Sequence, residues 1–357
     1  MTARSHSAMS AMPRVFVGWD SREDIAWQVC RSSMLRHASV PIMVTALRQP
    51  KLREAGLYRK PADPLASTEF TYTRFFVPHL AGHSGWALFC DCDFLWLGDV
   101  GELFALADER YALMCVHHDH RPPETMKMDG CVQTLYPRKN WSSMVLYNCG
   151  HPANRALTPD VVNREGGAFL HRFQWLDDAL IGAVPETWNW LEGWNDKPAN
   201  GKPHVVHYTR GGPWFPNWQN VDYAAEWLEE ARRFEAEGGA EMWAVFDFWQ
   251  EELTTVRNPR SDAAIGNLVR ARFRALHARA IEGALATWRA TAQGRIAELL
   301  LLGDWATHLA TDAATARSGR ALARRLAREA AQGAMNLTPA EAGVVARAAA
   351  FETAAAS

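Results

Sequence analysis

Short apolar runs and helically spaced apolar positions follow one another along the first two thirds of the chain. Apolar, β-branched runs predict buried strands at 14–19, 41–47, 86–90, 111–116, 143–148 and 203–206. Helical spacing predicts helices over 22–37 and 68–80, whereas 48–66 has prolines and no clean period and is expected to be loop. Strands that alternate with helices predict an α/β fold whose sheet is mostly parallel and covered by helices.

The pattern changes near residue 254. Residues 254–357 contain 14 Arg, no Lys and 8 Asp and Glu, with Leu268, Phe273, Leu276 and Ile281 at helical spacing. We therefore expect two domains, an α/β catalytic domain over 1–253 and an all-helical extension over 254–357. Such helices suit packing or self-association, and their basic faces also suit peripheral contact with anionic lipid.

Charge and cysteine content narrow the classes of protein. The 357 residues carry a net charge of −2, which argues against binding nucleic acid through a basic surface. No run reaches the roughly 18 apolar residues needed to cross a bilayer, and the first residues lack the apolar core of a secretory signal. Six cysteines without a CxxC pair point to a reducing cytoplasm, with the inner membrane face as a potential site of peripheral contact.

The strongest chemical signal is Phe89-Cys90-Asp91-Cys92-Asp93, at the end of an apolar run. In an extended chain, carboxylates two residues apart point to the same side. Two hard oxygen ligands suit Mn²⁺ or Mg²⁺, which bridge substrate phosphates. Asp20 also follows a strand, and ligands of parallel sheets bind beyond the carboxyl ends of the strands. We therefore expect Asp20, Asp91 and Asp93 to converge on one edge of the sheet.

The second signal is His207-Tyr208-Thr209-Arg210-Gly211-Gly212-Pro213-Trp214. A neutral imidazole is a good ligand for Mn²⁺, and the double glycine lets the backbone approach a ligand closely. Arg210 offers a fork of donors to phosphate. A turn beside a buried histidine is the structural alternative.

In their order along the chain, these motifs resemble those of the family-8 glycosyltransferases, which have the GT-A fold. The resemblance covers roughly residues 14–218. It implies that Asp20 contacts the nucleotide base, that Arg74 in Thr71-Tyr72-Thr73-Arg74 approaches the donor, and that Asp91, Asp93 and His207 bind the metal. Residues 141–148 are similar to the family's Asn-Ser-Gly-Val-Met-Leu-Phe-Asn strand, with Trp141 in place of the first asparagine and Ser143 in place of the glycine.

The chain departs from the family elsewhere too. Gly212 replaces the lysine that precedes Pro-Trp, so Arg210 would have to hold the diphosphate. The family's Asp-Gln pair near the reacting carbon falls at Asp177 and Asp178, which would orient the sugar or act as nucleophile. Asn140 lies one residue before the expected acceptor asparagine.

The expected function is metal-dependent transfer of a hexose from a nucleotide sugar, in the first instance a UDP-sugar, to an acceptor hydroxyl with retention. The acceptor is a glycan, a lipid-linked sugar, a protein or a small molecule, and polysaccharide biosynthesis fits such a reaction. Donor-binding residues are expected to be Gly18, Trp19, Asp20, Arg74, Cys92, Arg210, Gly211 and Gly212. The 16 tryptophans suit core packing and sugar stacking alike. Acceptor-binding residues are expected to be Asn140, Trp141, Trp188 and Trp214.

Three alternatives stay open. A sugar- or nucleotide-binding protein of the same fold without turnover would tolerate the altered lysine and asparagine positions. A nucleotidyltransferase would need a glycine-rich, basic first loop, which residues 18–22 do not provide. A phosphatase of the haloacid-dehalogenase type also uses an Asp-x-Asp, but on its first strand.

Overall fold

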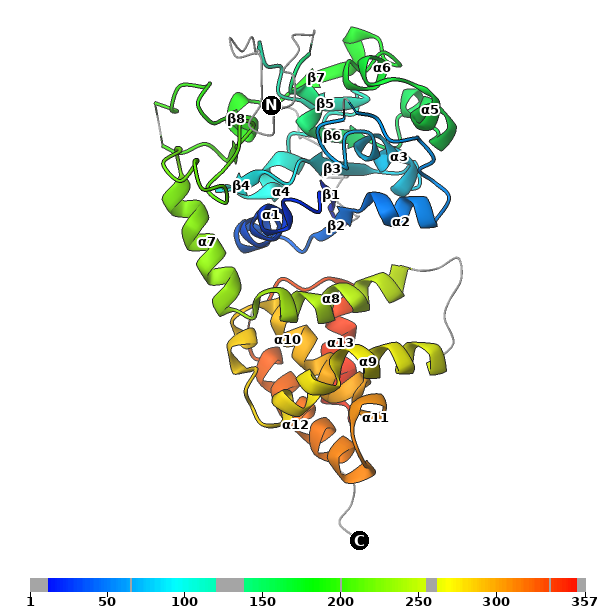
Figure 1. The fold of residues 1–357 in the computed structure, drawn as a ribbon, viewed down its shortest axis with the longest axis vertical. Helices are drawn as coiled ribbons and strands as arrows, with labels where there is room; N and C mark the ends of the chain where they lie inside the picture. Colours follow the sequence, from blue (N-terminus) through cyan, green and yellow to red (C-terminus); the bar gives the residue numbers. More distant parts are fainter. Residues whose placement is uncertain are drawn as a thin grey trace, which may run out of the picture. The chain divides into compact units, whose positions relative to one another are not determined.

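The computed structural model describes residues 12–64, 66–119, 138–199, 201–254, 262–333 and 335–351. The chain divides into two compact units, Met1–Ala231 and Arg232–Ser357. Figure 1 shows that the first unit contains both strands and helices, whereas the described part of the second unit contains helices without strands. The composition change near residue 254 falls at the end of helix α8, inside the second unit.

A six-stranded sheet forms the centre of the first unit. Its strands are β1 (Arg14–Gly18), β2 (Met43–Leu47), β3 (Trp86–Cys90), β5 (Leu113–Cys115), β6 (Met144–Asn148) and β7 (Ile181–Ala183). Their order is β2-β1-β3-β6-β5-β7, which runs from bottom to top in Figure 1. Strand β1 pairs in parallel with β2 and β3, β5 pairs in parallel with β7, and β6 runs antiparallel to both of its neighbours.

A second, three-stranded sheet lies beside the end of β3. It has the order β4-β9-β8, formed by β4 (Phe94–Trp96), β8 (Trp190–Leu191) and β9 (Val205–His207). Strands β4 and β9 are antiparallel, with Phe94 opposite His207. This pairing brings two segments more than a hundred residues apart in the sequence next to each other.

Helices pack around the sheets of the first unit. They are α1 (Asp24–His37), α2 (Gln49–Glu54), α3 (Val77–Leu80), α4 (Val100–Phe104), α5 (Pro159–Arg164) and α6 (Gly167–His171), and α7 (Ala224–Ala236) crosses the boundary between the units. Short 3-10 turns are η1 (Thr73–Phe76), η2 (Trp141–Ser143), η3 (Pro152–Ala156), η4 (Asp178–Leu180) and η5 (Glu186–Asn189). Helix α1 buries Trp27, Cys30 and Met34 in the main core, where the inward faces of the sheet strands also pack.

The expected α/β fold with a mixed, mostly parallel sheet flanked by helices is confirmed. The prediction of a loop over 48–66 is wrong in part, because Gln49–Glu54 form α2. Pro50 lies in the first turn of this helix, where proline is tolerated. Instead of one helix over 68–80, the structure has the 3-10 turn η1 followed by the short helix α3. Pro78 lies in the first turn of α3. Strands β4, β7 and β8 have only two or three residues, too few to show a period in the sequence.

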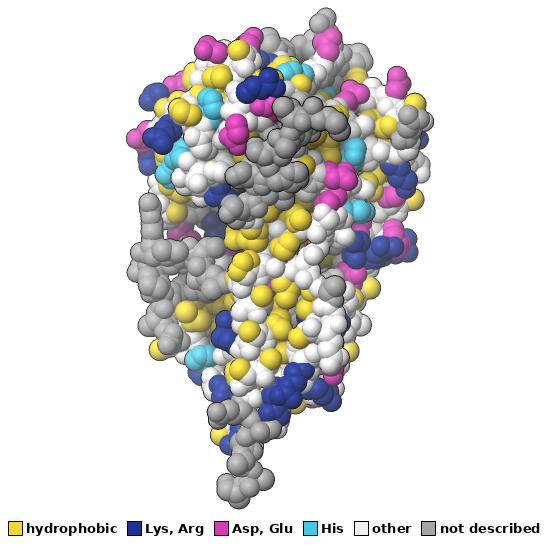
Figure 2. Space-filling view, turned by 180° about the vertical axis from the view of Figure 1, so that it is seen from behind, with side chains coloured by type: hydrophobic (Ala, Val, Ile, Leu, Met, Phe, Trp, Pro, Cys, Tyr) yellow, Lys and Arg dark blue, Asp and Glu magenta, His cyan; other side chains and the backbone are white. Residues whose placement is uncertain are grey.

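The second unit is helical, as expected for the extension. Its elements are α8 (Gly239–Thr254), α9 (Asp262–Ile281), η6 (Ala286–Ala290), α10 (Ala292–Leu299), the π-turn Leu300–Asp304, α11 (Ala306–Leu309), α12 (Ala313–Ala331) and α13 (Pro339–Ala349). Leu300, Leu301 and Leu302 are fully buried in its core. Arg317, Arg325 and Arg328 of α12 are exposed, and Figure 2 shows basic side chains, all arginine in this unit, gathered near its lower end. Among the described residues, no helix combines the length and apolar character that a bilayer span requires.

Candidate metal centre

The turn between β3 and β4 carries two carboxylates to the end of the central sheet. Parallel pairing sets Val17 of β1 opposite Cys90 of β3, so Asp20 and Asp91 leave the sheet at the same edge, as expected. Successive side chains alternate: Asp91 and Asp93 are partly exposed, whereas Cys92 is 1% exposed and packs in the main core. The Asp-x-Asp spacing therefore presents both carboxylates on one side of the turn.

The third member of the cluster comes from β9. His207 lies opposite Phe94 and stacks on its ring, with the ring centroids 4.3 Å apart and an interplanar angle of 25°. The potential ligand atoms of Asp91, Asp93 and His207 all lie within 4.8 Å of one another. Nε2 of His207 is 3.5 Å from Oδ1 of Asp93.

The cluster fits a divalent cation. Oδ1 of Asp93 is buried and has no hydrogen-bond partner among the described residues. A buried carboxylate oxygen without a donor is costly unless a ligand such as a metal ion satisfies it. Two carboxylates and one imidazole form a donor set that suits Mn²⁺, and the oxygen ligands also suit Mg²⁺.

Asn189, which the sequence pattern did not single out, supports the imidazole. Its Oδ1 lies 2.8 Å from Nδ1 of His207, and its Nδ2 donates to Oγ of Ser143 at 2.9 Å. Asn189 is fully buried at the end of η5. The only signal in the sequence was an asparagine between two tryptophans, which does not reveal its partner.

Arg74 lies at the cluster, as the motif suggested, but it faces a protein carboxylate. Its Nη1 is 2.9 Å from Oδ1 of Asp91 and donates to the backbone oxygen of Ser142 at 2.8 Å. The guanidinium lies over the rings of Phe70 and Phe89. Arg74 therefore neutralises part of the acidic charge of the cluster.

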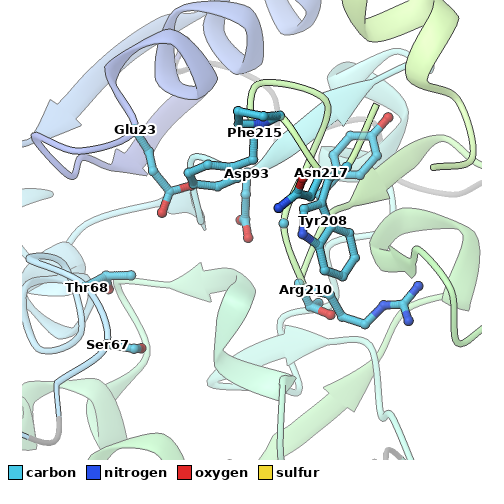
Figure 3. Close-up of a pocket in the computed structure, with 12 residues that line it drawn as sticks. Glu23, Ser67, Thr68, Asp93, Tyr208, Arg210, Phe215 and Asn217 are labelled. Atoms are coloured by element: carbon cyan, nitrogen blue, oxygen red, sulfur yellow. The ribbon is translucent and has the colours of Figure 1, made fainter. Parts of the chain in front are cut away.

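A pocket of about 360 Å³ opens beside Asp93, a volume within the roughly 300–1,000 Å³ usual for small-molecule sites. It is lined by Glu23, Ser67, Thr68, Asp93, Tyr208, Thr209, Arg210, Gly211, Phe215, Pro216, Asn217 and Trp218. In Figure 3 the carboxylates of Glu23 and Asp93 both point into the pocket. Burial, together with the negative charges of Asp93 and Asp20, raises the pKa of Glu23 to about 8.

Asp20 is fully buried and organises the loop that follows β1. Its carboxylate accepts from Nε and Nη2 of Arg22 at 2.9 and 2.8 Å, and from the backbone N–H of Glu69 at 3.1 Å. Burial alone would raise the pKa of Asp20, but these hydrogen bonds and the charge of Arg22 lower it below its usual value. The structure thus shows Asp20 paired with Arg22 and Glu69, and it is not among the residues that line the pocket.

Of the glycine-rich segment after His207, Gly211 lines the pocket with a φ of 130°, a conformation that favours glycine. A methyl group on Gly212 would lie 1.9 Å from the ring of Trp214, so Gly212 serves packing. Nη2 of Arg210 is 3.3 Å from Oε2 of Glu192, and its guanidinium lies over Trp194 and Trp218. Figure 3 shows this guanidinium turned away from Asp93.

Three other residues expected at the donor have structural partners. A methyl group on Gly18 would lie 2.4 Å from Cγ of Phe70. Trp19 donates from Nε1 to Oδ1 of Asp24 at 2.8 Å. Burial raises the pKa of the Cys92 thiol well above its usual value, because the core around the thiol disfavours the charged form.

None of the residues expected at the acceptor is among those that line this pocket. Trp141 stacks on His117, Trp188 is 3% exposed and stacks on His204, and Trp214 packs near Tyr208 and Trp227. The aromatic residues that do line the pocket are Tyr208, Phe215 and Trp218. The number of tryptophans in the sequence does not show which of their rings pack in the core and which line the pocket.

Asn140 and the two remaining carboxylates complete the expected set. Asn140 has a left-handed φ of 64°, and its buried Nδ2 has no hydrogen-bond partner in the described part of the chain. Asp177 and Asp178 are exposed, and Asp178 forms an ion pair with Arg138. Neither carboxylate belongs to the cluster of Asp91, Asp93 and His207.

Several solved structures have a fold similar to that of this chain over about three fifths of its length. The bifunctional glycosyltransferase WbbM matches 62% of this chain and 50% of its own, with 14% identity and a TM-score of 0.44. The apo-form glycosyltransferase GlyE of Streptococcus pneumoniae matches 62% and 60%, with 16% identity and a TM-score of 0.43. The galactosyltransferase LgtC, in complex with donor and acceptor sugar analogues, matches 61% and 95%, with 13% identity and a TM-score of 0.41.

Sequence comparison gives a closer relationship. No family model matches the chain, so membership of family 8 stays a prediction. Protein CDI of Arabidopsis thaliana is 54% identical over 231 residues, which cover 64% of this chain and 89% of Protein CDI. With more than half of the aligned residues identical over nearly the whole of that relative, the chain belongs to the family of Protein CDI.

Proposed function

We propose that this chain is a metal-dependent glycosyltransferase that moves a hexose from a nucleotide sugar to an acceptor hydroxyl. The convergence of Asp91, Asp93 and His207 beside a pocket of about 360 Å³ carries the proposal. The ordered motifs that resemble family-8 glycosyltransferases support it further. A UDP-sugar is the donor that these motifs favour.

Asp91, Asp93 and His207 would hold Mn²⁺ or Mg²⁺. A cation bound there would offset the negative charge of a departing diphosphate. The flat face of Trp218, which is partly exposed, suits stacking on a base or a sugar, and Gly211 lets the backbone approach the ligand.

For the second substrate, we propose that Asn140 offers its amide to a sugar hydroxyl. Among the residues that the structure describes, its buried Nδ2 has no hydrogen-bond partner, which supports this role, since such a donor is costly unless an acceptor satisfies it. Asp177 or Asp178 orients the sugar at the reacting carbon, and the reaction proceeds with retention, on the strength of the sequence motif alone. The acceptor is a glycan, a lipid-linked sugar, a protein or a small molecule.

We place the reaction in the cytoplasm and associate it with polysaccharide biosynthesis. Cys30, Cys90, Cys92, Cys115 and Cys149 are buried free thiols, which suits a reducing compartment. The exposed arginines of α12 are proposed to serve self-association or contact with an anionic membrane surface.

Nucleotide-sugar hydrolysis in the presence and absence of Mn²⁺ tests the proposal. UDP- and GDP-sugars are screened, and thermal stabilisation by each donor is measured in parallel, because a ligand that binds only the folded state raises Tm. Asp93→Asn should abolish the Mn²⁺ dependence of both signals. Asp99→Asn is the matched control, because Asp99 caps α4 and lies outside the cluster.

The outcomes separate the candidate functions. Turnover that needs Mn²⁺ and Asp93 supports the transferase. Stabilisation by a nucleotide sugar without any turnover would favour the binding protein instead. If neither Mn²⁺ nor any nucleotide sugar raises Tm, the proposal fails.

A further inference from the structure

A buried chain of hydrogen bonds holds His207 from the side opposite the cluster. Nδ1 of His207 lies 2.8 Å from Oδ1 of Asn189, whose Nδ2 lies 2.9 Å from Oγ of Ser143. Oγ of Ser143 in turn lies 2.6 Å from the backbone oxygen of Asn140. His207, Asn189 and Ser143 are 3%, 0% and 4% exposed, so their polar groups depend on one another for hydrogen bonds.

The backbone oxygen at the end of this chain determines the direction of every bond in it. A carbonyl oxygen only accepts, so the hydroxyl of Ser143 donates its single proton to Asn140. Oγ of Ser143 must then accept from Asn189, which directs the amide NH₂ toward Ser143 and the amide oxygen toward His207. Because the amide oxygen also only accepts, Nδ1 of His207 must donate.

We propose that Asn189 is a positioning residue that fixes His207 as the Nδ1–H tautomer. In a neutral imidazole this leaves Nε2 with a lone pair and no proton. Nε2 faces Oδ1 of Asp93 at 3.5 Å, so two electron-pair donors approach each other in a buried place, which suits a cation. This inference rests on the proposed metal site and adds what makes its histidine a competent ligand.

The other tautomer of His207 shows why the hydrogen bond to Asn189 matters for metal binding. With the proton on Nε2, His207 would donate to Asp93, and that hydrogen bond would oppose the entry of a cation. The carboxylate that the metal needs thus favours the wrong tautomer. The hydrogen bond to Asn189 counteracts this preference, and the stacked ring of Phe94 holds the plane of the imidazole.

Long-range ¹H–¹⁵N NMR of the histidine side chains tests the tautomer without any metal. Wild-type protein in EDTA at pH 8 should show His207 protonated at Nδ1 and unprotonated at Nε2. In Asn189→Ala the proton should shift toward Nε2. Wild-type protein with an Nε2–H tautomer or an imidazolium would overturn the inference, and this measurement does not depend on whether any variant folds.

Mn²⁺ affinity, measured by electron paramagnetic resonance, tests the consequence. Asn189→Ala should weaken Mn²⁺ binding by roughly 10- to 100-fold, the usual effect of losing a residue that orients a ligand. Asn189→Asp keeps an acceptor oxygen and should retain wild-type affinity within a few-fold. Ser143→Ala removes the group that directs the amide and should give a smaller loss than Asn189→Ala.

Asn154→Ala is the matched control. Asn154 is also fully buried and donates to the backbone oxygens of Ala112 and Asn148 at 2.6 and 2.8 Å, outside the cluster. This variant should lose stability and keep both the Nδ1–H tautomer of His207 and its Mn²⁺ affinity. Equal weakening in Asn154→Ala and Asn189→Ala would overturn the inference.

The two proposals fail in different ways. A wild-type protein that binds no Mn²⁺ contradicts the proposed function and the ligand role of His207 together. Mn²⁺-dependent turnover that survives in Asn189→Ala with unchanged Mn²⁺ affinity contradicts only the role of Asn189.

Discussion

Nη1 of Arg74 lies 2.9 Å from Oδ1 of Asp91, so a buried guanidinium and the proposed cation share one carboxylate. Arg74→Met should destabilise the metal-free protein by roughly 3–5 kcal/mol, because removing one partner of a buried pair leaves the other charge uncompensated. Mn²⁺ should then restore more stability than in the wild type, because the cation replaces the missing positive charge. The rise in Tm on adding Mn²⁺ measures this effect.

Arg36→Met provides the comparison for Arg74→Met. Nε of Arg36 is 2.9 Å from Oε2 of Glu230, which is 7% exposed, so this variant also breaks a largely buried pair. It should lower stability and leave the Mn²⁺-induced rise in Tm at the wild-type value. Equal rises in the two variants would show that Arg74 does not share its carboxylate with the cation.

The pocket carboxylate Glu23 should make stability depend on pH. Its pKa is raised from 4.5 to about 8, so between these values the folded protein keeps a proton that the unfolded chain has lost. The contribution of Glu23 to stability is therefore greatest below pH 4.5, falls as the pH rises toward 8 and stays constant above that. Glu23→Gln cannot titrate and should be more stable than the wild type at pH 8, by an amount on the order of a few kcal/mol.

Urea unfolding at pH 5, 7 and 8.5 in EDTA measures the contribution of Glu23. The difference between Glu23→Gln and the wild type should grow with pH. Glu54→Gln, an exposed position in α2, controls for the substitution itself. Parallel pH profiles for Glu23→Gln and the wild type would contradict the prediction.

The proposed role of Asp177 and Asp178 rests on the sequence motif, because both are exposed and lie outside the cluster of Asp91, Asp93 and His207. If either orients the sugar, replacing it by asparagine should lower kcat by roughly 100-fold, the cost of misplacing a reacting group by about 1 Å. Both side chains are exposed, so Tm should not change. Asp160→Asn is a suitable control, because Asp160 is also exposed and paired with an arginine, Arg59. Wild-type rates in both single variants would remove these carboxylates from the mechanism.

The sequence predicted the parts of the site that depend on local patterns. Strand β3 is a continuous apolar run that ends at Asp91, and its parallel pairing with β1 accounts for the common edge with Asp20. His207 was found through its motif. In each case the residue lies at the end of a strand or within two positions after it, where the local sequence pattern shows it.

The rest of the site depends on pairings between distant segments. Asn189 meets Ser143 across 46 residues, and Arg74 meets Ser142 across 68 residues. Neither contact produces a periodic pattern in the sequence, because each joins two short 3-10 turns that are far apart along the chain: η5 and η2 for Asn189 and Ser143, and η1 and η2 for Arg74 and Ser142. For the same reason Trp188 and Trp214 could not be told apart from Trp218, which alone of the three lines the pocket.

Gly18 shows how a glycine expected at a ligand can serve packing instead. A methyl group there would lie 2.4 Å from Cγ of Phe70, a buried ring, whereas the backbone itself could accept a side chain. Gly18→Ala should therefore cost roughly 1–3 kcal/mol through overpacking. In a Phe70→Ala background the same substitution should cost far less, because the ring that obstructs the methyl group is gone.

Urea unfolding of the wild type, the two single variants and the double variant yields the coupling energy between these positions. A large coupling confirms that Gly18 is required by Phe70, whereas equal costs in both backgrounds would contradict it. Thermal stabilisation by UDP-sugar in the same four proteins separates packing from binding. If Gly18→Ala weakens this stabilisation in the Phe70→Ala background, where the methyl group fits, Gly18 must also lie against the donor. An unchanged response would assign Gly18 to the core alone.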